Sequence, residues 1–148
     1  MKKMGIIYGS STGTCESIAQ TIAEKLGVAS VDVIDASKIT TEKVESYDIL
    51  LLGTSTWGDG ELQDDWYDAI KMIKTADLNG KIVALFGCGD SESYCDTFCD
   101  GMGVIYDQFL LQDGYFQLPC HGYTTALLPH HPCFLYLLKS PYYLCVPF

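Results

Sequence analysis

The sequence predicts an α/β fold in which helices cover both faces of a parallel sheet. Two segments, "YDILLLG" (47–53) and "KIVALFG" (81–87), are continuous apolar runs, which are typical of strands buried on both faces. The shorter runs "MGIIY" (4–8) and "SVDVID" (30–35) are predicted as two further strands. Helical segments separate these runs, and alternation at this length implies right-handed crossovers and a doubly wound sheet.

The helices are predicted from apolar residues that recur at helical spacing. The first helix contains Ile18, Ala19, Ile22, Ala23 and Leu26, and Gly27 is expected to cap its C-terminus. A second helix covers 66–73, and "TADLNGK" (75–81) ends it. A third is expected from about residue 93 to residue 108.

The segment "YGSSTGTCESIA" (8–19) places six small or hydroxylated residues, 10–15, between a strand and a helix. Backbone N–H groups and hydroxyls then converge on the helix N-terminus, which favours an anion. No Lys follows Gly13, and the spacing does not fit a dinucleotide-binding loop. The chain contains no arginine, which excludes a cysteine-phosphatase loop. A neutral cradle for a phosphate monoester remains, with a Ser/Thr-rich helix cap as the alternative.

Two more loops follow the third and fourth predicted strands. They read "TSTWGDGELQDDW" (54–66) and "GCGDSESYCDTFC" (87–99). Ligands of such sheets bind beyond the carboxyl ends of the strands, so all three loops are expected at one edge. Trp57 and Tyr94 are placed to stack on the two faces of a flat ring. A phosphate site beside two aromatic rings predicts a phosphorylated planar cofactor.

These three loops together resemble the flavin mononucleotide (FMN) loops of short-chain flavodoxins. The resemblance covers roughly residues 3–107 and implies a flavodoxin-like sheet of order 2-1-3-4-5 with FMN as cofactor. It implies that the phosphate is bound by Ser10, Ser11, Thr12, Gly13, Thr14 and Cys15. Cys15 stands where the family usually has Asn, and its backbone N–H is expected to donate instead.

The resemblance also assigns roles around the flavin ring. Trp57 and Tyr94 are expected to stack on it, and the peptide joining Gly58 and Asp59 is expected to turn over on one-electron reduction. Backbone groups expected at the polar edges of the ring belong to Ser55, Thr56, Gly58, Cys88, Gly89 and Asp90. No catalytic residue and no metal ligand is implied.

By resemblance, the chain is a low-potential electron carrier that works between redox partner proteins, and not an enzyme. Seven carboxylates are expected around the ring, where they would disfavour a negatively charged reduced flavin: Asp59, Glu61, Asp64, Asp65, Asp90, Glu92 and Asp96. For Asp64, Asp65 and Asp96 a purely solvated surface is the preferred interpretation. The alternatives for the chain are a flavodoxin-like NAD(P)H-dependent flavin reductase and a defective, non-functional flavodoxin.

Composition restricts the partners and the compartment. A net charge of −10 argues against nucleic acid and anionic membranes and favours basic, transient protein partners of a monomer. The seven cysteines, without a recognisable signal peptide, indicate a reducing cytoplasm. No run reaches membrane-spanning length without interruption.

Residues 108–148 differ in composition from the flavodoxin-like region 1–107. Asp113 and Lys139 are their only charged residues, and they hold all five prolines and all three histidines. "DGYFQLP" (113–119) is a poor candidate for the fifth strand, and prolines prevent a final helix in 128–148. A changed reading frame is the preferred interpretation, and a divergent hydrophobic terminus that meets a partner or membrane is the alternative.

Two cysteine-containing groups are considered as further sites. Cys95 and Cys99 lie four residues apart on a predicted helix, and idle thiols are preferred to a redox pair. The Cys/His cluster in 120–133 fits no standard zinc spacing.

Overall fold

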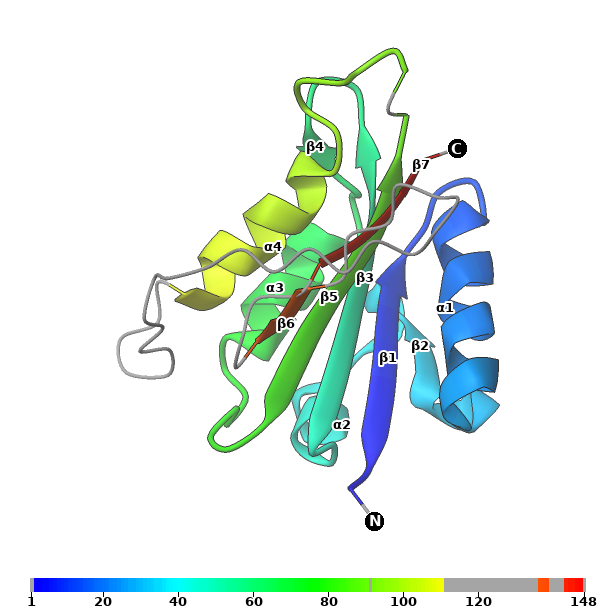
Figure 1. The fold of residues 1–148 in the computed structure, drawn as a ribbon. Helices are drawn as coiled ribbons and strands as arrows, with labels where there is room; N and C mark the ends of the chain where they lie inside the picture. Colours follow the sequence, from blue (N-terminus) through cyan, green and yellow to red (C-terminus); the bar gives the residue numbers. More distant parts are fainter. Residues whose placement is uncertain (1, 91, 111–135, 139–142, 148) are drawn as a thin grey trace.

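The computed structural model describes residues 2–90, 92–110, 136–138 and 143–147. Its centre is one sheet in which β1 (Met4–Gly9), β3 (Ile49–Trp57) and β5 (Ile82–Gly89) are parallel neighbours (Figure 1). β2 (Val33–Asp35) pairs in parallel with the outer side of β1. The strand order β2-β1-β3-β5 confirms the predicted doubly wound sheet over its first four positions.

Helices cover both faces of this sheet. α1 (Thr14–Leu26) lies on one face, and α3 (Trp66–Ile73) and α4 (Asp100–Leu110) lie on the other (Figure 1). The shorter elements are α2 (Thr41–Glu45), the 3-10 turns η1 (Ser30–Asp32) and η2 (Ala36–Lys38), and β4 (Glu61–Leu62), which pairs with β3. No helix in the described part of the chain is both long and apolar enough to span a bilayer.

Residues of the continuous apolar runs belong to two separate hydrophobic cores, one on each face of the sheet. In β3, Leu50 and Leu52 join the core under α3 and α4, whereas Leu51 joins the core under α1. In β5, Leu85 and Phe86 divide in the same way. Successive side chains of a strand point to opposite faces, so a strand covered on both faces needs apolar residues at every position.

Two predicted elements have different bounds in the structure. Residues 30–32 form η1 and not a strand, because the Asp32 N–H turns back to the carbonyl of Ala29. The third predicted helix begins at Asp100 and not near residue 93. In between, the Asp90 carboxylate accepts hydrogen bonds from the N–H groups of residues 92 and 93, which folds the segment into turns.

The C-terminal segment contributes two strands beside β5. β7 (Tyr143–Pro147) pairs with β5 in parallel, and β6 (Tyr136–Leu138) pairs with it antiparallel. The predicted fifth strand, 113–119, lies outside the described residues. Where the structure describes the segment 128–148, it forms strands and no helix.

Candidate functional site

The first loop connects β1 to α1 and leaves the start of the helix open. Gly13 takes the N-cap position with φ +87°, and no side chain caps the helix there. The Ser10 hydroxyl accepts a hydrogen bond from the Gly13 N–H at 3.1 Å, which closes the loop. The hydroxyl oxygens of Thr12 and Thr14 lie 3.5 Å apart, and Ser11 is exposed. An uncapped 13-residue helix beside several hydroxyls fits an anion.

Cys15 contributes only its backbone to this loop. Its side chain is fully buried in the core under α1, where it contacts the thiol of Cys88 from the end of β5. The hydrogen bond with Cys88, together with burial, raises the pKa of the Cys15 thiol, which therefore stays neutral. That the N–H of Cys15 donates to an anion stays a prediction.

The second loop is a tight hairpin between β3 and β4. Trp57 pairs with Glu61 across the hairpin, and Gly58 (φ +47°) and Gly60 (φ +94°) form the turn between them. A positive φ is a conformation that glycine adopts at little cost. The Trp57 side chain remains 38% exposed, and its indole N–H donates to the Ser55 hydroxyl at 2.9 Å.

The hairpin is tied to α4 by a contact across 45 residues. The Thr56 hydroxyl accepts a hydrogen bond from the Gly101 N–H in the first turn of α4, at 3.2 Å. A Cβ added to Gly60 would lie 3.1 Å from the Cβ of Asp100, so the turn also lies against that helix. The sequence does not predict this arrangement, because the residues that make these contacts carry no local signal for them.

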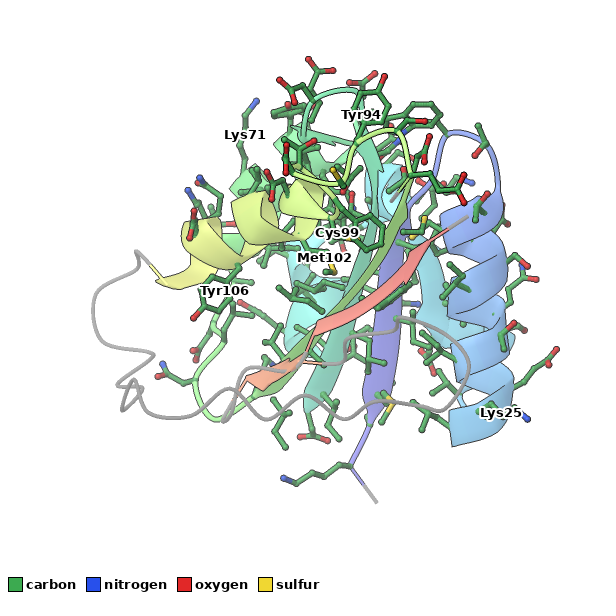
Figure 2. All side chains as sticks on the ribbon, turned by 45° about the horizontal axis from the view of Figure 1, so that its top comes forward. Lys25, Lys71, Tyr94, Cys99, Met102 and Tyr106 are labelled. Atoms are coloured by element: carbon green, nitrogen blue, oxygen red, sulfur yellow. The ribbon has the colours of Figure 1, made fainter. Side chains whose placement is uncertain are left out.

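The third loop follows β5 and carries Tyr94. Cys88 and Gly89 are buried at the end of the strand, and Asp90 begins the turn. Hydrogen bonds from the hydroxyl and backbone N–H of Ser93 lower the pKa of the Asp90 carboxyl. Tyr94 is 45% exposed and lies on this loop, at the opposite end of the molecule from Lys25 in the last turn of α1 (Figure 2).

The sheet brings the three loops to one edge. Gly9 pairs with Thr54 and Ser55 pairs with Cys88, so β1, β3 and β5 end beside one another. The structure therefore places residues 10–15, 55–59, 88–90 and 92–94 at neighbouring strand ends, as the sequence predicts.

The edge is acidic. Within the described residues the ion pairs are Lys3–Asp32 and Lys71–Asp68, so neither involves any of the seven predicted carboxylates. Asp65 and Asp90 are partly buried, and the exposed members are Asp59, Glu61, Asp64, Glu92 and Asp96.

The cysteine groups supply no second site in the described residues. Cys95 is a free, exposed thiol, so it forms no disulfide with Cys99. No group of three or more metal-ligating side chains occurs in the described part of the chain, and the cluster 120–133 lies outside it.

Fold and loops define a doubly wound α/β protein in which an uncapped helix N-terminus and two exposed aromatic side chains lie at one sheet edge. The sequence profile of the flavodoxin family matches residues 6–111, and the chain belongs to this family.

Flavodoxin 1 of Escherichia coli (strain K12) is 52% identical over 103 residues, which are 70% of this chain and 58% of that protein. Flavodoxin of Klebsiella pneumoniae is 50% identical over 107 residues, 72% of this chain and 61% of that protein. The chain thus spans about three-fifths of these curated relatives.

Solved structures show the same fold. The Fusobacterium nucleatum flavodoxin bound to flavin mononucleotide has a TM-score of 0.64 at 26% identity, covering 88% of this chain and 80% of that one. Oxidised flavodoxin 1 from Bacillus cereus has a TM-score of 0.61 at 29% identity, covering 73% and 74%.

Proposed function

We propose that this chain binds FMN at the three-loop edge and carries single electrons between redox partner proteins at low potential. The observation that supports this most strongly is the uncapped N-terminus of α1 at the same sheet edge as two exposed aromatic rings. One neutral phosphate site and one ring site match a flavin mononucleotide. The Fusobacterium nucleatum relative is a flavodoxin bound to that molecule.

Each loop has a separate task in this proposal. Residues 10–15 bind the phosphate through backbone N–H groups and hydroxyls. Trp57 and Tyr94 stack on the ring, and backbone groups of residues 55–59 and 88–90 meet its polar edges. Bound FMN supplies the one-electron chemistry, and the protein supplies orientation and electrostatics.

The carboxylates at this edge form no ion pair within the described residues, and they bear on both the reduction potential and the choice of partner. Negative charge beside a bound ring makes additional negative charge on that ring unfavourable, which lowers its reduction potential. The same charge attracts basic partner proteins to the edge where electrons would leave, and such association is fast and transient. We infer on these grounds a carrier that meets basic partners transiently; that the carrier is monomeric and cytoplasmic stays a prediction.

Titration of the purified protein with FMN tests the proposal. The flavin fluorescence should be quenched at one FMN per chain, and FAD should bind more weakly. Trp57→Ala and Tyr94→Ala should each weaken binding by about 1–3 kcal/mol, because each removes one stacking ring. Tyr67→Ala is the matched control: this ring is 53% exposed but lies outside the three loops. FMN that keeps its full fluorescence with the parent protein would overturn the proposal.

A second measurement separates a carrier from a reductase. NADPH alone should leave the bound FMN oxidised, and adding a separate NADPH-dependent flavoprotein reductase should reduce it. Direct reduction by NADPH would identify the chain as a flavin reductase instead.

A further inference from the structure

The orientation of the Trp57 ring is fixed by a buried acceptor. Its indole N–H donates to the Ser55 hydroxyl at 2.9 Å, although the ring itself is 38% exposed. An indole N–H on an exposed ring has water available as an acceptor. Here it bonds instead to the strand two residues earlier, which restricts the rotation of the side chain.

The position of Ser55 is fixed by its burial and by its contacts within the sheet. It is 3% exposed, lies within β3 and pairs with Cys88 across the ladder to β5. Its carbonyl accepts the hydroxyl of Thr54 at 3.0 Å. The Ser55 hydroxyl is therefore part of the rigid sheet and not of the loop that follows it.

Trp57 is consequently fixed at both ends. Its backbone pairs with Glu61 in the hairpin, and the tip of its indole is bonded to Ser55. The second ring is held differently. The Tyr94 N–H bonds to the Asp90 carbonyl at 3.3 Å, and within the described residues no side-chain hydrogen bond is found for its ring. One side of the proposed ring site is thus set before a ligand arrives, and the other is free to adjust.

We propose that Ser55 is a positioning residue that holds the Trp57 indole in its ring-stacking orientation in the flavin-free protein. This inference rests on the proposed binding of FMN. Ordering a mobile side chain during binding weakens affinity by about 2- to 12-fold, and a prior hydrogen bond removes most of that cost.

Flavin-free protein gives the first test, through the two indole N–H signals in a ¹⁵N-correlated NMR spectrum. Trp57→Phe removes one signal and so assigns it. Trp66 supplies the internal reference, since its ring is fully buried and its N–H donates to the Gly53 carbonyl at 2.9 Å. Ser55→Ala should shift the Trp57 signal and speed its exchange with water, with Trp66 unchanged. Ser55→Thr keeps a hydroxyl and should restore slow exchange. A Trp57 signal that Ser55→Ala leaves unchanged would overturn the proposal.

Ligand binding gives the second test, with FMN and with riboflavin, which lacks the phosphate. Ser55→Ala should raise the dissociation constants of both ligands by about 2- to 12-fold when Trp57 is present. In the Trp57→Phe background, the same change should have no effect. Ser46→Ala is the matched control, because the Ser46 hydroxyl donates to the Lys43 carbonyl at 2.7 Å just before β3 begins.

Two outcomes of this second test would contradict the assignment. If Ser55→Ala weakened the binding of FMN but not of riboflavin, the Ser55 hydroxyl would be shown to act on the phosphate. An equal loss in the Trp57→Phe background would show that Ser55 does not act through the indole. A parent protein that binds neither ligand would refute the proposed function, and the NMR test would still decide the role of Ser55.

Discussion

Gly9→Ala tests how tightly the first loop is built onto the buried core. Gly9 is the last residue of β1 and precedes the proposed phosphate loop, residues 10–15. A Cβ at this position would clash with Oε1 of Gln63 and would lie 2.5 Å from Cδ1 of Trp66. Neither neighbour is free: Trp66 is fully buried, and Gln63 exchanges hydrogen bonds of 2.7 and 3.1 Å with Asp65. Since ordinary contact begins at 3.4 Å, the indole must move by about 0.9 Å (3.4 − 2.5).

The expected cost has two parts. Overpacking a well-packed core costs about 1–3 kcal/mol. A displaced Trp66 also loses its hydrogen bond to the Gly53 carbonyl, and an unpaired buried N–H costs a further 1–3 kcal/mol or so. Together these amount to about 2–6 kcal/mol of a total stability that is about 5–15 kcal/mol for a domain. The thermal midpoint should fall by roughly 5–20 °C.

Urea unfolding followed by circular dichroism measures this loss, provided that the slope m stays unchanged. Gly103→Ala is the matched control, because Gly103 lies within α4 and a Cβ there would meet no atom of the described residues within 4 Å, apart from the backbone of the helix itself. This control should gain about 0.5–1 kcal/mol from the better helix propensity of Ala. A Gly9→Ala protein within about 0.5 kcal/mol of the parent would refute the packing argument.

Three further predictions concern the loops and the C-terminal segment. In Gly58→Ala the added Cβ has room, since Glu61 Oε2 is 3.5 Å away, but the backbone φ of +47° disfavours Ala by about 1–2 kcal/mol. Potentiometric titration of the FMN-loaded variant should show altered one-electron potentials. Unchanged potentials would contradict a redox role for this turn. The pKa of the Asp90 carboxyl in the folded protein lies below its ordinary value of 3.8. The hydrogen bonds by which the carboxylate stabilises the third loop are therefore fully present above pH 3.8 and are lost as the pH falls through the lowered pKa. FMN affinity should fall over this pH range, and Asp90→Asn should remove this part of the pH dependence. If residues 108–148 arise from a changed reading frame, a chimaera that carries the C-terminus of Escherichia coli flavodoxin 1 in their place should be more soluble than the native chain and unfold at a higher temperature. A native chain with the same solubility and unfolding temperature as the chimaera would refute that interpretation.

The elements predicted most accurately from the sequence are those that a local pattern of residues determines. The strands β3 and β5 were found because burial on both faces requires apolar residues at each position. The end of α1 was found because Gly27 adopts φ +68° there and returns its N–H to Ala23. The start of α4 was misplaced, because helical spacing carries no information about the turn that the Asp90 carboxylate stabilises.

Contacts between distant segments were beyond sequence reasoning. The Thr56–Gly101 hydrogen bond joins a strand end to a helix start across 45 residues, and both residue types are common in loops. The Cys15–Cys88 contact is of the same kind: each cysteine was assigned to a loop, and only the fold shows that their thiols meet in the core.

The two ends of the proposed site therefore depend on the sequence in different ways. At the end where we propose that the phosphate binds, the groups available to it are mostly backbone N–H groups, and their direction is set by Gly13 and by the start of α1. In this proposal Cys15 serves at that position through its N–H, because its side chain is buried in the core. At the ring end the contacts are side chains, so the identity of Trp57 and of its buried acceptor Ser55 matters directly. Substitutions that keep the backbone should be tolerated at the first end, whereas at the second even the loss of one hydroxyl should weaken flavin binding.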